Sequence, residues 1–136
     1  MVTNPPEFGY WYLDSSVILR AAINNSRAAQ EWLTKAKQNH GVFVASRLTS
    51  IEVTRVLKRY GHPQTLVAPY LGDCIFVTIS DSIATVAEHL EPKLSGADSI
   101  HIATALQLKN TGITLLTHDR EWRSQQKRST SQFSTR

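Results

Sequence analysis

The sequence lacks several features that define common protein classes. Its 136 residues contain one cysteine, Cys74, which excludes an internal disulfide framework and a cysteine-rich zinc site. No apolar run approaches the roughly 20 residues that a membrane-spanning helix requires. No glycine-rich loop of the P-loop type is present, which disfavours nucleotide hydrolysis on that scaffold. The first residues show no basic stretch followed by an apolar one, so we expect a cytoplasmic protein without a signal peptide.

Positive charge is unevenly distributed along the chain. The sequence has 15 lysine and arginine residues against 11 aspartate and glutamate residues, a net charge of +4. Residues 1–119 hold ten of each sign, so the whole excess lies in the polar C-terminal end. We therefore predict a folded domain over residues 1–122 and a basic, poorly ordered tail over residues 123–136. The tail's cations either contact nucleic-acid phosphates or are simply solvated.

Short apolar runs alternate with helical patterns along residues 9–122. Helices of about ten to fifteen residues between strands are typical of parallel βαβ units. Apolar runs without clean alternation indicate strands that are buried on both faces. We predict a three-layer α/β/α domain with a mainly parallel central sheet of four to five strands. The predicted strands are residues 10–13, 42–45, 74–79 and 113–116, and the predicted helices are residues 17–23, 27–38, 49–60, 62–71, 82–90 and 97–110.

Four carboxylates fall at junctions between these elements. Asp14 follows the first strand directly, and Asp119 follows the fourth after two residues. Glu52 and Asp98 fall in the first turns of two predicted helices. In an open parallel sheet, ligands collect beyond the carboxyl ends of the strands. Acids that converge there would repel one another unless a cation neutralised them, and oxygen ligands without cysteine or a histidine cluster favour Mg²⁺ or Mn²⁺ over zinc.

Each acid also fits a purely structural role. Asp14 and Asp119 could be helix N-caps, and the other two acids have capping-box spacing after Thr49 and Ser95. Ser26 and Asp81 are predicted to cap two further helices. Because capping does not require acids at these particular junctions, we favour a metal–carboxylate site. Such a site suits phosphoryl transfer, since a cation can polarise a phosphodiester oxygen and lower the pKa of a bound water.

Four segments together resemble a known family. They are LDSSVI (residues 13–18), TSIEV (49–53), ADSIHIATAL (97–106) and LTHD (116–119). In this order they are similar to the PIN-domain family, and within it to VapC-type toxins of toxin–antitoxin modules. The resemblance spans residues 9–122, and the third segment is its most specific part. It implies an endoribonuclease that depends on Mg²⁺ or Mn²⁺, is usually a homodimer, and is held inactive by a cognate VapB-type antitoxin whose tail occupies the acidic groove.

The resemblance also implies a role for each acid. Asp14 and Asp98 match the main metal ligands. Glu52 matches the acid that completes the site and helps to position or activate water. Asp119 matches a fourth acid, which lies outside the main ligand set or at a second ion.

Three further residues match the same segments. Ser16 and Thr117 match small hydroxyl positions that hydrogen-bond the site carboxylates or water. His101 also matches, but its place in an apolar helix favours a packing role, since a lone histidine is a poor metal site. The chain departs from the family pattern after Trp122, where a polar tail stands in place of a further helix and strand.

Two other interpretations stay open. An RNase H-like nuclease also uses four carboxylates on an α/β sheet, but it normally begins with an antiparallel meander, and here helices interrupt the opening strands. A catalytically silent PIN-like module would bind RNA or a protein partner without cleaving anything. The presence of all four acids favours the nuclease.

Overall fold

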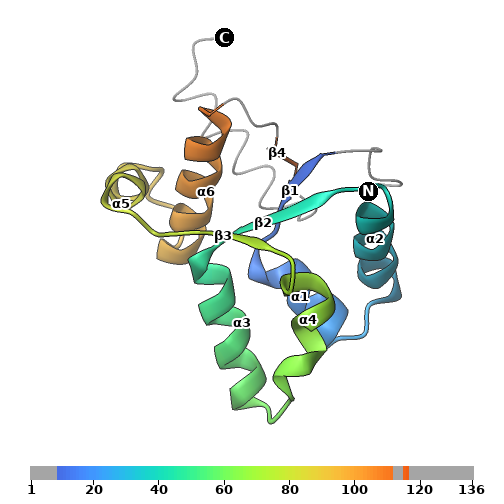
Figure 1. The fold of residues 1–136 in the computed structure, drawn as a ribbon. Coiled ribbons are helices and arrows are strands. Elements are labelled where there is room, and N and C mark those ends of the chain that lie inside the picture. The colour runs from blue at the N-terminus through green and yellow to red at the C-terminus, as the bar shows by residue number, and fades with distance from the viewer. Residues whose placement is uncertain (1–8, 112–114, 117–136) are drawn as a thin grey trace.

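The computed structural model of the chain describes residues 9–111 and 115–116. Strands and helices alternate along this part of the chain, as predicted (Figure 1). The elements are β1 (Tyr10–Tyr12), α1 (Ser15–Ala22), α2 (Arg27–Gln38), β2 (Val42–Ser46), α3 (Arg47–Arg59), the 3-10 helix η1 (Gln64–Val67), α4 (Ala68–Leu71), β3 (Ile75–Val77), α5 (Asp81–Glu88), α6 (Gly96–Lys109) and β4 (Leu115–Leu116).

The four strands form one parallel sheet. Their order is β3-β2-β1-β4, and every neighbouring pair is parallel. In the central pair, Tyr12 of β1 lies opposite Val44 of β2. Because these strands run in the same direction, their carboxyl ends lie at one edge, from which α1 and α3 depart. The predicted α/β fold with a parallel sheet is confirmed, and the described part of the chain contains four strands.

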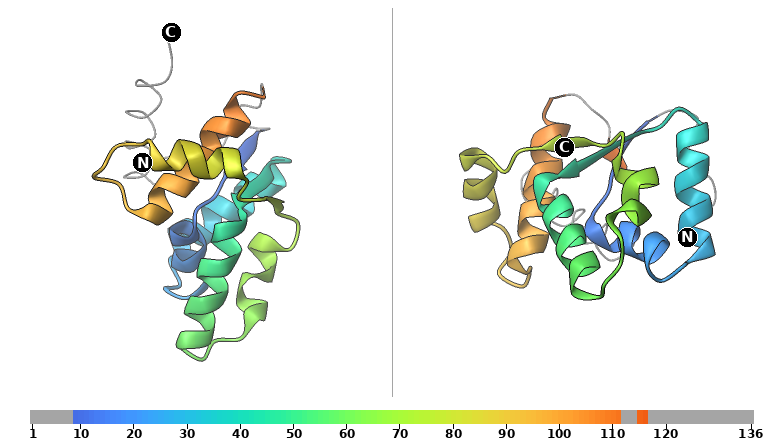
Figure 2. Two further views of the ribbon diagram at one scale, coloured as in Figure 1. Left: turned by 90° about the vertical axis from the view of Figure 1, so that its left-hand side faces the viewer. Right: turned by 60° about the horizontal axis from the view of Figure 1, so that its bottom comes forward.

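Helices cover both faces of the sheet. Successive strand residues point to opposite faces, and Trp11 and Phe43 pack on one face with α1, α2 and α3. Tyr12 and Val44 pack on the other face with α5 and α6. Figures 1 and 2 show the two groups of helices on either side of the strands. Burial on both faces explains why these strands lack alternating polar residues.

Serine hydroxyls fix where several helices begin. Ser26 caps α2 as predicted, and its hydroxyl accepts a hydrogen bond from the Ala29 amide at 3.2 Å. The predicted cap at Asp81 is wrong by one residue. Ser80 accepts from the Ile83 amide at 3.2 Å, and Asp81 is the first residue of α5.

The start of α3 also differs from the prediction. Ser46, the last residue of β2, caps the helix by accepting from the Leu48 amide at 3.0 Å. Thr49 is therefore not the cap. It is buried within the helix, and its hydroxyl donates to the carbonyl oxygen of Leu13 at 3.3 Å. This bond ties α3 to the residue that precedes Asp14.

The segment between α3 and the third strand is less regular than predicted. The single helix predicted over residues 62–71 is divided into η1 and α4. Pro69 lies in the first turn of α4, where its missing N–H costs no helical hydrogen bond. Among the described residues, no helix is both long and apolar enough to cross a membrane.

Candidate active site

Asp14 occupies the junction between β1 and α1 and caps that helix. Its Oδ1 accepts hydrogen bonds from the Ser16 hydroxyl at 2.8 Å and from the Val17 amide at 3.3 Å. The side chain is half-buried. A carboxylate offers about four acceptor positions on its two oxygens. Capping through Oδ1 is therefore compatible with a second role as a cation ligand.

Glu52 lies on α3 beyond the end of β2. It is in the second turn of the helix, not the first, because α3 begins at Arg47. Its Oε1 is 3.1 Å from Nε2 of His101, and its side chain is 28% exposed. Burial acts to raise the pKa of Glu52, but the hydrogen bond from His101, the charge of that ring and a hydrogen bond with Ser15 together lower it below its ordinary value. The structure therefore favours the carboxylate form of Glu52.

His101 links Glu52 to the buried end of β1. The histidine is 2% exposed, in agreement with the expected packing role. Its Nδ1 is 3.0 Å from the Oη of Tyr12. Burial raises the pKa of Tyr12 above its ordinary value, although hydrogen bonds with Thr104 and Ser46 act to lower it. The Tyr12 hydroxyl is thus a protonated group inside the fold.

Sequence reasoning missed this connection. Nothing marked Tyr12 as different from the other aromatic residues of its strand. The one available signal was the spacing of Asp98 and His101, which are three residues apart and therefore share a side of α6. Because His101 follows the candidate ligand Asp98 by about one helical turn, the sequence allowed it to be assigned either to the site or to the core.

Asp98 lies in the first turn of α6. Ser95 caps the helix by accepting from the Asp98 amide at 3.0 Å, so the predicted capping spacing corresponds to a real cap. The Asp98 side chain is exposed. Within residues 9–111 its carboxylate has no hydrogen-bond or ion-pair partner. Because His101 contacts Glu52 one turn later, Asp98 lies on the side of α6 that faces α3.

Asp14, Glu52 and Asp98 have the oxygen ligands that a hard divalent cation prefers, but by themselves they are not a complete ligand set. They offer carboxylate oxygens from three helices near one edge, which is the chemistry that Mg²⁺ prefers. Within the described residues, no three His, Cys, Asp or Glu side chains are grouped so that they could hold a metal ion. The contact that is formed joins Glu52 to His101. Asp119 and Thr117, the remaining predicted site residues, lie outside the described residues.

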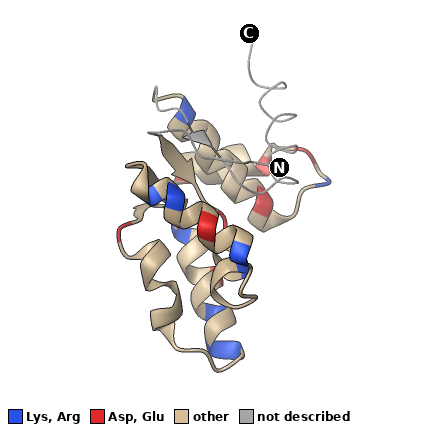
Figure 3. Ribbon diagram, turned by 90° about the vertical axis from the view of Figure 1, so that its right-hand side faces the viewer, with Lys and Arg blue, Asp and Glu red and all other residues tan. Residues whose placement is uncertain are grey.

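Positive charges lie on the same side of α3 as Glu52. Arg55 and Arg59 follow Glu52 by three and seven residues, the spacing of one helical face. Both are exposed, and neither is paired with a carboxylate among the described residues. A rise of 1.5 Å per residue places them about 4.5 and 10.5 Å beyond Glu52 along the axis. Figure 3 shows positive charge at the end of α3 that is farthest from the sheet.

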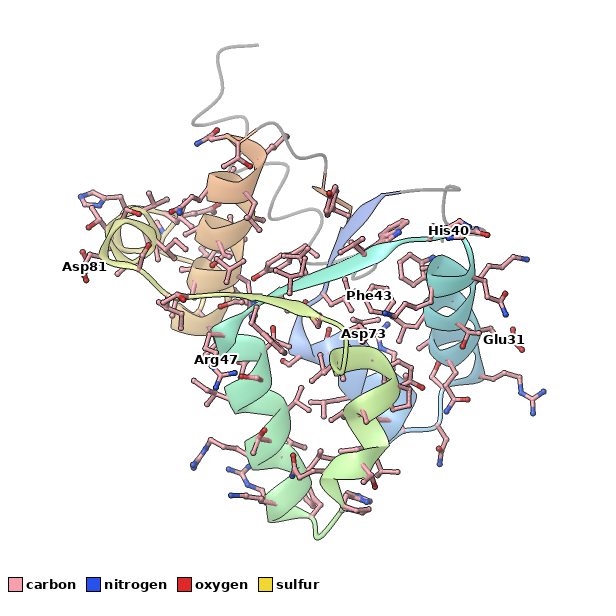
Figure 4. All side chains as sticks on the ribbon, viewed as in Figure 1. Glu31, His40, Phe43, Arg47, Asp73 and Asp81 are labelled. Carbon is pink, nitrogen blue, oxygen red and sulfur yellow. The ribbon has the colours of Figure 1, made fainter. Side chains whose placement is uncertain are left out.

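Several other acids belong to different parts of the surface. Glu31 on α2 and Asp81 on α5 lie on opposite sides of the molecule (Figure 4). Asp73 precedes β3 and forms an exposed ion pair with Lys37 at 3.4 Å. None of these residues lies at the starts of α1, α3 or α6, so the candidate site is distinguished by position and not by charge alone.

Comparisons with families and curated proteins give consistent matches. Residues 11–127 match the PIN domain, a range that includes all four predicted acids. The chain is similar to "Ribonuclease VapC47" of Mycobacterium tuberculosis (strain CDC 1551 / Oshkosh). The two are 31% identical over 113 residues, which cover 79% of this chain and 83% of the relative.

Solved structures with a similar fold include three proteins of toxin–antitoxin systems. A toxin–antitoxin complex from Klebsiella pneumoniae has a TM-score of 0.61 at 25% identity, covering 91% of this chain and 90% of that one. VapC20 of Mycobacterium tuberculosis, a toxin described as cleaving the sarcin–ricin loop, has a TM-score of 0.60 at 16% identity, with coverages of 84% and 93%. VapBC2 of Rickettsia felis bound to promoter DNA has a TM-score of 0.60 at 11% identity, with coverages of 81% and 99%. The last two similarities concern the fold alone.

Proposed function

The chain belongs to the PIN domain family, and from this premise we propose that it is a metal-dependent endoribonuclease toxin of the VapC type. The observation that carries the proposal is the position of Asp14 at the cap of α1 and of Glu52 and Asp98 in the first two turns of α3 and α6, near the carboxyl edge of the central strands. Ligands of open parallel sheets bind at this edge. The curated relative that matches most of the chain is named a ribonuclease, which supports RNA as the substrate.

We assign the metal to the acidic residues of this edge. Asp14 and Asp98 would be the main ligands of Mg²⁺ or Mn²⁺, with Glu52 completing the site and Asp119 as the fourth acid. The bound cation would polarise a phosphodiester oxygen and lower the pKa of an attacking water. As a carboxylate, Glu52 can accept a hydrogen bond from that water and orient it.

Two hydroxyl groups have supporting roles in the proposal. Ser16 restrains the Asp14 carboxylate through the hydrogen bond to Oδ1 at 2.8 Å. A carboxylate held in this way keeps its remaining acceptor positions in a defined direction. We propose the equivalent role for Thr117, which precedes Asp119 by two residues.

Substrate RNA would lie along α3. Arg55 and Arg59 are exposed and unpaired within the described residues, and they share a side of the helix with Glu52. They are four residues apart, which corresponds to about 6 Å along the helix axis. Arginine forks bind phosphate oxygens in pairs. Two phosphates on one side of the cleavage point could therefore be held while the scissile bond lies beside Glu52.

The remaining parts of the proposal concern assembly. We propose that a cognate VapB-type antitoxin inhibits the protein by occupying the acidic groove, and that the active form is a homodimer. RNA and antitoxin would both be met in the cytoplasm. The similarity to a toxin–antitoxin complex at 25% identity, covering nine-tenths of both chains, supports the antitoxin.

One observation favours a second function, that of a catalytically silent module that binds RNA or a protein partner. The described acids include no group of three that could hold a metal ion. If Asp119 does not complete the site, the exposed arginines of α3 would still bind RNA without cleaving it.

RNA cleavage by the purified chain separates these functions. Structured RNAs are incubated with Mg²⁺ or Mn²⁺ and wild type, Asp14→Asn, Asp98→Asn or the control Glu31→Gln, whose acid lies on the outer side of α2. We expect cleavage by wild type and Glu31→Gln, and a loss of at least about 100-fold in both aspartate variants. Equal cleavage by all four proteins would contradict the site. RNA binding without cleavage by wild type would favour the silent module.

A further inference from the structure

A hydrogen-bonded chain of three side chains runs from the sheet to the candidate site. Tyr12 Oη is 3.0 Å from His101 Nδ1, and His101 Nε2 is 3.1 Å from Glu52 Oε1. The residues belong to β1, α6 and α3, and the two contacts span 89 and 49 positions of sequence. Tyr12 and His101 are buried, whereas Glu52 is partly exposed. These two hydrogen bonds therefore connect the interior of the fold to Glu52, a candidate metal ligand.

The chemistry of the groups assigns donors and acceptors along this chain. A carboxylate only accepts, so His101 Nε2 must carry the proton that it donates to Glu52. When the imidazole is neutral, the other nitrogen is an acceptor, and Nδ1 then accepts from the hydroxyl of Tyr12. Tyr12 thus selects the neutral tautomer of His101 that can hold Glu52.

Packing alone does not explain the choice of partner. A buried histidine requires hydrogen-bond partners, but a backbone carbonyl could provide the acceptor. Here the acceptor is a partly exposed carboxylate on another helix. The donor from α6 therefore restrains a flexible side chain that could otherwise occupy several rotamers.

We propose that Tyr12 and His101 are positioning residues for Glu52. Tyr12 fixes the tautomer of His101, and His101 fixes the orientation of the Glu52 carboxylate. The effect of this positioning on catalysis rests on the proposed nuclease function. The direction of the hydrogen bonds between Tyr12, His101 and Glu52 does not. Removal of groups that orient metal-site carboxylates typically costs about 10–100-fold in metal affinity or activity.

Two amide substitutions at His101 separate positioning from packing. Glutamine is long enough to place an amide N–H near the position of Nε2, whereas asparagine reaches only the position of Nδ1. We expect His101→Gln to retain kcat within about threefold of wild type, and His101→Asn to lose about 10–100-fold in kcat with KM within about twofold. Tyr12→Phe removes one hydroxyl and should lower kcat by about 3–10-fold. Tyr60→Phe is the matched control, because Tyr60 is exposed at the far end of α3.

Nitrogen NMR of the histidine rings tests the proposal without any reaction. We expect the Nε2–H tautomer for His101 in wild type and in Tyr60→Phe, and a mixture of tautomers in Tyr12→Phe. An Nδ1–H tautomer in wild type, or equal kcat in the glutamine and asparagine variants, overturns the proposal.

Failure of the nuclease function is distinguishable from failure of the positioning pair. If wild type cleaves no RNA, calorimetric titration with Mn²⁺ alone replaces the kinetic comparison. The positioning role of Tyr12 and His101 is supported if His101→Asn binds Mn²⁺ more weakly than His101→Gln and if wild type shows the Nε2–H tautomer. In that case only the nuclease function is refuted. Equal Mn²⁺ binding by the two variants counts against the positioning pair. No Mn²⁺ binding by wild type counts against the metal site, and the NMR tautomer of His101 then decides on the pair alone. Thermal melting shows whether each variant is folded.

Discussion

Asp14 has two separable roles, and three substitutions distinguish them. Its carboxylate caps α1 through the amide of Val17 at 3.3 Å, and we propose that it also binds the metal. Asparagine caps a helix about as well as aspartate, but it is neutral and a much weaker ligand. We therefore expect Asp14→Asn to change the free energy of unfolding by less than about 0.5 kcal/mol. Asp14→Ala should lose about 1 kcal/mol, because the cap is removed.

The effect of the Asp14 substitutions on the cleavage rate should depend on the loss of the carboxylate charge and not on the change in the free energy of unfolding. Loss of a ligand that stabilises the charge developing at phosphorus costs about 3–4 kcal/mol of activation free energy, which corresponds to about 100- to 1,000-fold in kcat. Both Asp14 variants should show this loss. Ser26→Ala is the matched control, since Ser26 caps α2 with equivalent geometry at 3.2 Å and lies outside the junctions that carry the candidate acids. It should lose about 1 kcal/mol and retain full activity.

The assay combines urea unfolding with RNA cleavage for the four proteins. Unfolding gives the change in stability, and cleavage at saturating RNA and metal gives kcat. A folded Asp14→Asn protein with wild-type kcat would refute the metal role and leave Asp14 as a helix cap. An Asp14→Asn protein that is as unstable as Asp14→Ala would instead show that the charge is required for the cap, and the two roles would no longer be separable.

Three further outcomes follow from the same contacts. Replacing Arg55 and Arg59 with alanine should weaken RNA binding and reduce the slope of log K against log salt by about 1.4, since each lost phosphate contact on single-stranded RNA contributes about 0.7; an unchanged slope in a filter-binding assay would place RNA elsewhere. Because the pKa of Glu52 is lowered in the folded, metal-free protein, its ionised form stabilises the fold above the ordinary glutamate pKa. This stability is lost as the pH falls through the pKa that Glu52 has in the folded protein. In acid unfolding, the stability of Glu52→Gln should therefore fall less steeply with pH than that of wild type. Leu33 of α2 is fully buried, so Leu33→Ala should cost about 2–5 kcal/mol in urea unfolding without changing RNA affinity.

The fold was predictable because local signals and burial agree along most of the chain. The apolar runs of β1 and β2 and the cap at Ser26 each indicate their element without help from distant residues. The start of α3 was misplaced because Ser46 and Thr49 are both acceptable caps. Thr49 is used instead to bind the Leu13 carbonyl, a choice that depends on how α3 packs against β1. Local sequence does not contain that information.

The positions of Asp14, Glu52 and Asp98 in the fold were predictable from the sequence, whereas the contacts of these residues were not. Element junctions indicated Asp14, Glu52 and Asp98, since residues at strand ends and helix starts lie near one edge of a parallel sheet. The link between Tyr12, His101 and Glu52 depends on the rotation of α6 about its axis and on its contact with α3. An isolated helical pattern does not define either quantity, so His101 was assigned to packing.

The two faces of the sheet differ in the size of the side chains that pack on them. Both described tryptophans and Phe43 pack under α1, α2 and α3, whereas smaller aliphatic side chains predominate under α5 and α6, interrupted by the polar groups around His101. Asp14 and Glu52 belong to the first layer, and Asp98 belongs to the second. Layers with fewer large apolar contacts open at lower free energy in hydrogen exchange. We therefore expect the amides of α5 and α6 to exchange faster than those of α1, and a ligand that bridges the two layers to slow amide exchange in α6 more than in α1.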